Sequence, residues 1–433
     1  MPIAEYTIPG LHVREHEATV PLDWSRPDAP ERITVFAREV VAAHRRHEDL
    51  PLVLFLQGGP GGKSPRPVDA SGWVGVLLER YRVVLLDQRG TGRSTRVDAS
   101  VMAGFPTAEA GAAHLACFRA DSIVRDAEHL RKTVYGGRRW TTLGQSYGGW
   151  ITLEYLSTAP EGVAACMVTG GLASLRPDAA DLYRRTYPRA LAKNRRFEAR
   201  YPEDVAALGR LADLLAEEDV RLPDDDRLTV RRLQMMGTRF GMQHGFEELH
   251  WLLDTATGSD GRPSDAFLAG VQAQTSFSEN PLWAALQEAA EYTDDASGAT
   301  AWAVQAEHDR HPEFAETARP LRLTGEMFFP WMFEEIRLLR PFGPAVEVLQ
   351  RRTDWPARYD RARLAANEVP VAAAVYFDDL YVDADLQLET AASVGGLETW
   401  VTDEWEHDGI GASGGDVVRH LQTMLDERGG ALR

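Results

Sequence analysis

One short segment of the chain combines a nucleophilic side chain with two glycines at a fixed spacing. Gly144-Gln145-Ser146-Tyr147-Gly148 has the G-x-S-x-G pattern, in which a serine stands on a tight turn between a strand and a helix. An apolar run, Trp140–Leu143, precedes the serine, and a helical stretch, Trp150–Ser157, follows it. This context favours Ser146 as a nucleophile for acyl transfer over a glycine-rich turn with an incidental serine.

A nucleophilic serine needs a general base, which comes last in the chain order Ser, Asp or Glu, His. The chain has 12 histidines, but only His407 and His420 lie far enough beyond Ser146 to follow the last strands. His420 falls inside the last helical stretch, about Gly415 to Glu427, and is expected at the surface. His407 stands between the predicted strand Leu397–Val401 and that helix, so it is the predicted base.

The base must be oriented by a carboxylate, which should follow the strand before it. That strand is predicted at Val369–Phe377, and three aspartates come after it: Asp378, Asp379 and Asp383. Spacing alone does not choose among them, and an acidic surface turn would show the same residues.

Acyl transfer also needs N–H groups that stabilise the oxyanion. The backbone N–H of Tyr147, directly after the nucleophile, is one expected donor. The other should come from a loop after an early strand, and Gln57-Gly58-Gly59-Pro60-Gly61-Gly62 follows the apolar run Pro51–Leu56. Glycines there let amides turn inward without side chains in the way.

This loop ends in Gly62-Lys63-Ser64 and so resembles half of a phosphate-binding loop. Such a loop would have glycine where Gln57 stands, and Pro60 removes one of its N–H donors, so a nucleotide site is rejected. There is no H-E-x-x-H segment, and His44 and His47 stand in an arginine-rich connector. We expect neither a metal nor a cofactor.

Composition narrows the class of partner. The chain has 433 residues and a formal net charge of −18, a field that disfavours nucleic acid and anionic membranes. The two cysteines, Cys117 and Cys166, fit reduced thiols better than a disulfide scaffold. The N-terminus has no signal-peptide pattern, and no window of eighteen residues is uniformly apolar. We expect a cytoplasmic protein; its oligomeric state cannot be predicted.

The elements that would position these residues form an interrupted α/β pattern. Short apolar runs that end in glycine turns alternate with helices, which is typical of a mostly parallel sheet flanked by helices. Strand-like runs then stop, and helix formers dominate until the strands return. We therefore predict a core at residues 1–171, a helical cap at 172–365 and the rest of the core at 366–433. The helices expected in the cap are Asp204–Asp219, Asp226–Met236, Pro281–Tyr292 and Arg352–Ala366.

Together these motifs resemble the proline iminopeptidases, serine peptidases of the α/β-hydrolase superfamily. The resemblance rests on segments spread over nearly the whole chain, and the later ones are similar to the branch with a larger cap. These segments are Leu54–Gly61, Asp87–Ser94, Gly144–Gly149, Glu279–Leu282, Thr324–Trp331, Val375–Asp383 and Glu406–Gly409. The resemblance implies an α/β-hydrolase fold with an inserted helical cap. It also implies a triad of Ser146, Asp379 and His407, with the amides of Gly59 and Tyr147 as oxyanion donors.

Members of that family bind the free imino group of the substrate with carboxylates from the cap. The resemblance points to Glu326, with Glu288 as its partner and Glu307 in reserve. A buried amine without a carboxylate would be costly, so a carboxylate pair suits such a ligand. The alternative for each glutamate is a solvated helix face. Aromatic residues near Glu326 could form the apolar wall for a proline ring: Phe328, Phe329, Trp331 and Phe333.

The sequence thus predicts a metal-independent serine exopeptidase that releases N-terminal proline from short peptides through a prolyl-enzyme ester. An aminopeptidase or esterase with broader specificity would share the triad but would not depend on Glu326 and Glu288. A non-catalytic binding protein with the same fold is a third hypothesis, since a fold alone does not establish chemistry.

Overall fold

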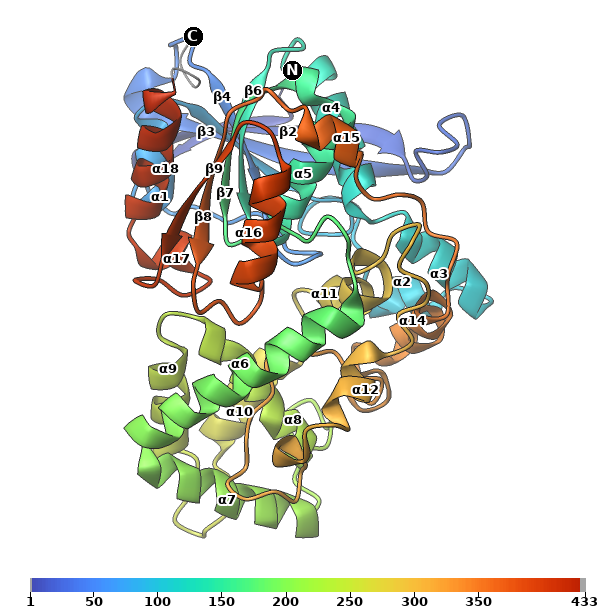
Figure 1. Ribbon diagram of the computed structural model, residues 1–433, viewed down its shortest axis with the longest axis vertical. Coiled ribbons are helices and arrows are strands. Elements are labelled where there is room, and N and C mark those ends of the chain that lie inside the picture. The colour runs from blue at the N-terminus through green and yellow to red at the C-terminus, as the bar shows by residue number, and fades with distance from the viewer. Residues whose placement is uncertain (1, 429–433) are drawn as a thin grey trace.

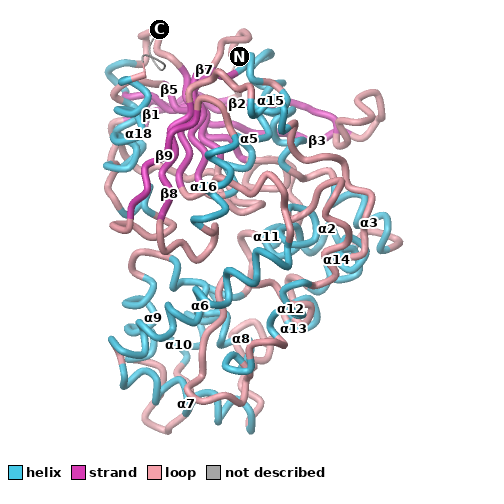
Figure 2. Tube along the Cα trace, viewed as in Figure 1, coloured by secondary structure: helices cyan, strands magenta, loops and turns pink. Residues whose placement is uncertain are grey.

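The computed structural model describes residues 2–428, whose centre is one nine-stranded sheet. The strand order is β1-β2-β3-β5-β4-β6-β7-β8-β9, and Figure 2 shows the strands gathered in the upper part of the molecule, with helices on both sides of them. The first three strands run antiparallel to their neighbours, and the pairs from β5 through β4 to β9 are parallel. The strands are β1 (Ala4–Ile8), β2 (Leu11–Pro21), β3 (Arg32–Ala42), β4 (Leu52–Leu56), β5 (Arg82–Asp87), β6 (Trp140–Gln145), β7 (Val163–Thr169), β8 (Val371–Tyr376) and β9 (Leu397–Thr402). The predicted mostly parallel sheet is confirmed.

Both faces of the parallel strands are buried, which explains why these strands are apolar without a break. In β4, Leu54 packs into one core cluster and Val53 into the other, because successive side chains point to opposite faces. The face of Leu54 is covered by α4 (Ala120–Thr133) and α5 (Tyr147–Thr158). The opposite face is covered by α1 (Gly72–Leu78) and α18 (Asp416–Glu427).

The remaining helices of the sheet-containing part are short. They are α2 (Ala99–Ala103), α3 (Ala108–Ala116), α15 (Arg361–Ala365), α16 (Ala384–Ser393) and α17 (Gly409–Ala412).

Between β7 and α15 the chain is helical and contains no strand longer than an isolated bridge among the described residues. Figure 1 shows this segment below the sheet, where the parallel strands end. Its helices are α6 (Ala179–Arg200), α7 (Pro202–Glu217), α8 (Val230–Gln234), α9 (Gly245–Asp254), α10 (Asp265–Thr275), α11 (Pro281–Leu286), α12 (Ala303–His308), α13 (Met332–Glu335) and α14 (Gly343–Gln350). The division at residues 171 and 365 stays a prediction.

Two helix predictions in this segment differ from the structure. The expected helix over Arg352–Ala366 forms only as α15, because Pro356 disfavours helical backbone at the residue before it and lacks an N–H. Conversely, α6 is the longest helix and carries Pro188 inside it, and no helix was predicted there.

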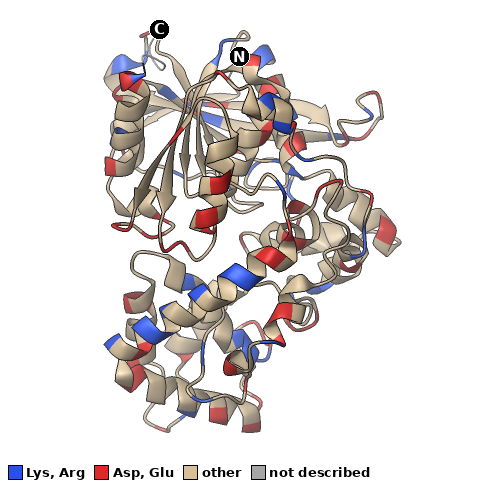
Figure 3. Ribbon diagram, in the orientation of Figure 1, with Lys and Arg blue, Asp and Glu red and all other residues tan. Residues whose placement is uncertain are grey.

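None of the helices in residues 2–428 is both long and apolar enough to cross a membrane. Charged residues of both signs are scattered over the sheet-containing and helical parts, as Figure 3 shows.

A buried arginine ties the antiparallel strands to the helices. Arg89 donates to both oxygens of Asp126, at 2.7 and 2.6 Å, and to the carbonyls of Leu22 and Cys117, both at 2.7 Å. Asp126 also accepts from the Trp24 indole at 2.8 Å. Removing one partner of a buried pair leaves the other charge without compensation.

We expect Arg89→Met to lower the free energy of unfolding by about 3–5 kcal/mol, because Asp126 and the carbonyls lose their donor. Urea denaturation monitored by circular dichroism would measure the loss. Arg419→Met is the control, since the Arg419–Glu79 pair is exposed and should leave the midpoint unchanged. Equal midpoints for the two variants would contradict this view of Arg89.

Candidate active site

Ser146 stands on a strained turn between β6 and α5. It has a positive φ, 54°, with ψ −123°, which is uncommon for a residue with a side chain. Its backbone N–H donates to the Thr169 carbonyl at 2.9 Å, and its carbonyl accepts from Gly149 N–H at 2.7 Å. These bonds fix the turn, so the serine is presented by a rigid backbone.

Backbone segments approach this turn too closely for any side chain. A Cβ on Gly148 would lie 1.9 Å from the Leu56 carbonyl oxygen, and one on Gly144 would lie 2.3 Å from the Gly148 oxygen. A Cβ on Gly171 would lie 2.2 Å from the Ser146 oxygen. The glycines of the motif are therefore required by contacts with β4 and with the loop after β7, as well as by the turn itself.

His407 and Asp379 come together at the ends of β9 and β8. His407 Nδ1 lies 2.7 Å from Asp379 Oδ2, and both side chains are almost completely buried. The other Asp379 oxygen accepts from the backbone N–H groups of Tyr381 and Val382, at 2.8 and 3.1 Å. These donors hold the carboxylate in place, and Nε2 is left as the imidazole nitrogen available to a nucleophile.

The alternative aspartates have other partners. Asp378 pairs with Arg196 at 2.7 Å, and Asp383 caps the start of α16 while lying 3.1 Å from Arg189.

The imidazole lies beside the nucleophile turn. A Cβ on Gly170 would lie 3.2 Å from His407 Nδ1, and Gly170 follows Thr169, whose carbonyl binds Ser146. Burial lowers the pKa of His407, but the charge of Asp379 and its hydrogen bond outweigh this and raise the pKa above its usual value. The pair suits a base that must hold a proton during acyl transfer.

The loop after β4 also reaches Ser146. A Cβ on Gly58 would lie 3.0 Å from Ser146 Cβ, and the Gln57 carbonyl is held by the Gln88 side chain at 2.7 Å. Within residues 2–428, the backbone N–H groups of Gly59 and Tyr147 donate to no other protein atom. Both are therefore available to an oxyanion.

Glu326 is a buried carboxylate on the side of the helical segment that faces His407. Its Oε1 accepts from the Trp283 indole N–H at 2.9 Å. Burial raises the pKa of Glu326 to about 8, while the charge of His407 and hydrogen bonds from Gln287 and Trp283 act in the opposite direction. Glu326 is therefore a carboxyl group that loses its proton more readily when a cation lies beside it.

Glu288 binds backbone N–H groups at the start of a helix, a role that the sequence did not predict. It lies in a π-helical turn, Gln287–Glu291, that continues α11. Its two oxygens accept from the backbone N–H groups of Ala303 and Val304, at 2.9 and 3.2 Å, so it caps α12. Burial raises the pKa of Glu288 to about 7.

The two glutamates share two tyrosine neighbours, Tyr183 and Tyr292. Burial, and then the charges of Glu326 and Glu288, raise the pKa of Tyr292 well above its usual value. The third cap glutamate, Glu307, is occupied by Arg310 and His311, at 3.3 and 3.2 Å.

The predicted aromatic wall divides into separate groups. Phe328 packs edge-to-face against Trp283, with ring centroids 5.2 Å apart, and so lies next to the partner of Glu326. Phe329 instead stacks with Trp331 at 6.1 Å. Phe333 packs against Trp302 at 5.8 Å. Of the four, Phe328 lies closest to the predicted anchor through its contact with Trp283.

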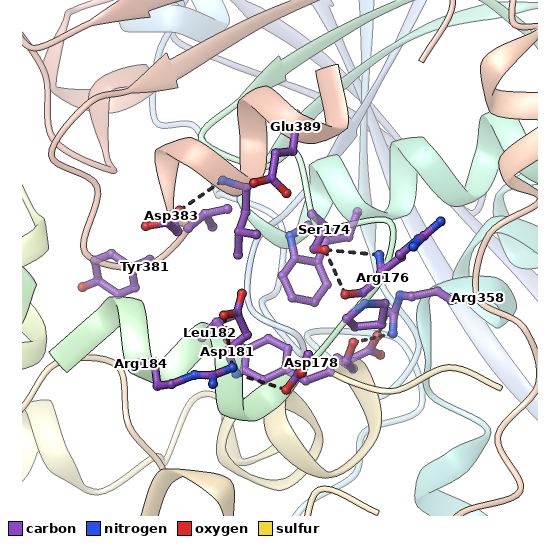
Figure 4. A pocket seen from close by; sticks show the side chains of 17 residues that line it. Ser174, Arg176, Asp178, Asp181, Leu182, Arg184, Arg358, Tyr381, Asp383 and Glu389 are labelled. Carbon is purple, nitrogen blue, oxygen red and sulfur yellow. Dashed lines mark hydrogen bonds and ion pairs between the residues drawn. The ribbon is translucent and has the colours of Figure 1, made fainter. Parts of the chain in front are cut away.

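Two cavities flank the aromatic ring that covers His407. The Tyr381 ring stacks on His407 at 4.5 Å. Tyr381 also lines a cavity of about 270 Å³ below α16, shown in Figure 4, and another of about 390 Å³ that Trp283 and Phe328 line. Both cavities are thus lined by a residue that contacts the base of the triad.

Several contacts of the site carry no signal in the sequence. Trp283 and Tyr381 have no motif spacing that marks them. The loop of His407 is bound to the helical segment, because His407 N–H donates to the Gly241 carbonyl at 3.0 Å and Lys193 pairs with Glu406. Such long-range contacts cannot be read from local patterns.

The geometry predicts which aspartate supports the nucleophile. Asp379→Asn should slow labelling of Ser146 by a fluorophosphonate probe by on the order of 10³–10⁴-fold, because the imidazole loses its orienting charge. Gel fluorescence against time would measure the rate. Asp378→Asn, a matched change one residue away, should label like the unaltered protein; the reverse result would contradict the assignment.

The chain is similar in sequence to known proteins. A family model described as the alpha/beta hydrolase fold matches residues 51–229. The proline iminopeptidase of Aeromonas sobria is 42% identical over 418 residues, covering 96% of this chain and 97% of its own. Proline iminopeptidase aneH of Aspergillus aculeatus is 31% identical over 422 residues, covering 94% of this chain and 92% of its own. The crystal structure of a Mycobacterium smegmatis proline iminopeptidase covers 95% of this chain and 98% of its own at 15% identity, with a TM-score of 0.45.

The predicted fold and family are thereby confirmed. Because the bacterial and fungal relatives align over nearly their whole lengths, the match includes the helical segment as well as the strands. The chain belongs to the proline iminopeptidase family of the α/β-hydrolase superfamily.

Proposed function

We propose that this protein is a serine exopeptidase that releases N-terminal proline from short peptides. The observation that carries the proposal is Glu326, a buried carboxylate whose pKa responds to the charge of His407 and which faces the same region as the triad. A buried carboxylate costs free energy unless it meets a cation, and a protonated imino group at a peptide N-terminus supplies one. The curated relatives named above carry the same activity in their names.

The reaction follows from the roles of the residues. His407, oriented by Asp379, takes the Ser146 proton as the oxygen attacks the prolyl carbonyl. The N–H groups of Gly59 and Tyr147 stabilise the oxyanion. His407 then donates the proton to the leaving amine, and water hydrolyses the prolyl ester by the reverse sequence of proton transfers.

Glu326 binds the imino group at the substrate N-terminus, so that the carbonyl of the first residue lies at Ser146. Phe328 packs against the proline ring, and Phe329 lies further away. Glu288 supports this pocket by capping α12 and supplies a second carboxyl group near Tyr292. The two free thiols, Cys117 and Cys166, support the cytoplasm as the compartment.

The substrate prediction is tested with two chromogenic amides. Prolyl-p-nitroanilide should be hydrolysed and its N-acetyl form should not, because acetylation removes the cation that Glu326 receives. Absorbance of released nitroaniline measures both. Ser146→Ala should release none from either. Equal turnover of both compounds would favour a general amidase or esterase, and no turnover of either would favour a binding protein.

The anchor is tested by the pH dependence of kcat/KM. As pH rises through about 8, Glu326 ionises and becomes able to pair with the imino cation, and His407, whose pKa is also raised, loses its proton, so kcat/KM should rise. Glu326→Gln should leave only the part of this rise that His407 causes and lower kcat/KM by about 10²–10⁴-fold, the effect of losing a buried charge partner worth roughly 3–5 kcal/mol.

Glu307→Gln is the matched control, since Glu307 is already paired with Arg310 and His311. Loss of the rise in this variant, with the rise retained in Glu326→Gln, would show that the anchor is assigned wrongly.

A further inference from the structure

A third cavity, of about 760 Å³, plays no part in the proposed reaction. It is lined by the first turn of α4, by the second half of α5 and by the loop before α15, Arg352–Asp360. Figure 1 shows that loop rising past the ends of α4 and α5. The active-site residues Ser146, His407 and Glu326 do not line it.

Three polar side-chain atoms in this cavity are buried without a partner, and the Arg119 guanidinium has a hydrogen bond only through Nη2, to the Thr293 carbonyl at 3.4 Å. The Arg119 Nε, the Trp355 indole N–H and the Ser157 hydroxyl have no hydrogen bond within residues 2–428. The three side chains are 6%, 4% and 3% exposed. Unpartnered buried donors are rare in folded proteins, and each one that occurs needs a group to receive it.

The donors are close to one another. The Arg119 guanidinium lies over the Trp355 ring, 4.5 Å from its centroid, and the Arg352 guanidinium lies 4.1 Å from the same centroid. Arg119 also precedes the first residue of α4, and no side chain caps that helix. The start of a helix of this length adds N–H groups that favour an anion. These donors together suit a carboxylate.

An acidic side chain faces the same cavity. Glu154 is 4% exposed, and neither it nor Arg119 forms an ion pair within the described part of the chain. Burial and the charge of Asp121 raise the pKa of Glu154 to about 8, and burial and the charge of Arg358 lower that of Arg119 to about 10, so the nearby opposite charges only partly offset the burial of each group. The cavity lining carries equal numbers of positive and negative side chains. The arginines are Arg119, Arg125, Arg352 and Arg358, and the carboxylates are Asp23, Asp121, Glu154 and Asp360.

From this arrangement we propose that the cavity binds a small zwitterion with an α-amino carboxylate, either a free amino acid or a short peptide. Its carboxylate is received by Arg119, the Trp355 indole N–H and the start of α4, and its ammonium or imino group by Glu154. A bare anion would leave Glu154 unpaired, and a bare cation would leave Arg119 unpaired. The site stands apart from the proposed peptidase activity and does not depend on it.

The cavity is connected to the nucleophile turn. Arg358 lines it and pairs with the buried Glu291, which accepts from the Tyr147 hydroxyl at 2.7 Å. Tyr147 is the residue directly after Ser146, so Arg358 and Glu291 link the cavity lining to the side chain next to the nucleophile.

Equilibrium dialysis of the Ser146→Ala protein with tritiated L-proline tests the proposal. We expect a saturable phase that weakens at least tenfold in Trp355→Phe, which removes only the indole N–H, and in Glu154→Gln, which removes only the charge. Trp283→Phe, a matched change beside Glu326, should leave this phase intact, so binding at the active site is told apart. Thermal melting would show that each variant is folded.

The outcomes are distinct. Competition by glycylglycine would identify short peptides as ligands, and competition by other free amino acids without it would identify amino acids; both support the proposal. Acetate competing as well as proline would overturn it in favour of a simple anion site. Absence of any phase sensitive to Trp355 and Glu154 would also overturn it, whether or not prolyl-p-nitroanilide is hydrolysed.

Discussion

The closeness of backbone to backbone around Ser146 is the constraint on which the rest of the site depends. Residues from β4, from the loop after β7 and from the start of α5 meet there at distances that no Cβ could enter. A serine with φ 54° is held in this strained conformation because its neighbours leave it no alternative. The parallel sheet brings these segments together, because the carboxyl ends of its strands lie at one edge.

The remaining groups of the site are positioned from a greater distance. Asp379 and His407 follow two further parallel strands, so the same sheet edge places them. Glu326, by contrast, comes from the helical segment and depends on the packing of Trp283 and the capping of α12 by Glu288. The rigid chemistry thus belongs to the sheet, and the recognition of a charged N-terminus belongs to an element with its own packing.

The sequence was sufficient for the parts governed by local patterns. The sequence predicted β4, β6, β8 and β9 to within a few residues, and the first three of these are buried on both faces, which gives them a simple apolar composition. The polar edge strand β1 was not predicted, since its residues are half exposed and lack that signature. The same limit applies to the site: Ser146 and His407 were marked by spacing, whereas Trp283, Tyr381 and Gly241 take part through contacts made only in the folded chain. Glu288 was expected to bind a ligand, but its hydrogen bonds first serve the backbone of α12.

The bond between His407 N–H and the Gly241 carbonyl has a consequence for how such proteins diverge. The base lies in a loop that is bound to the helical segment by hydrogen bonds to Gly241 and Gln243 and by an ion pair with Lys193. An inserted segment that merely covered a site could be exchanged between relatives without disturbing the chemistry beneath it. Here the insertion helps to position the loop that carries His407. Exchange of the helical segment at the strand ends would therefore remove contacts on which the position of the base depends. The helical segment that carries Glu326 and the loop that carries His407 are therefore expected to change together among relatives.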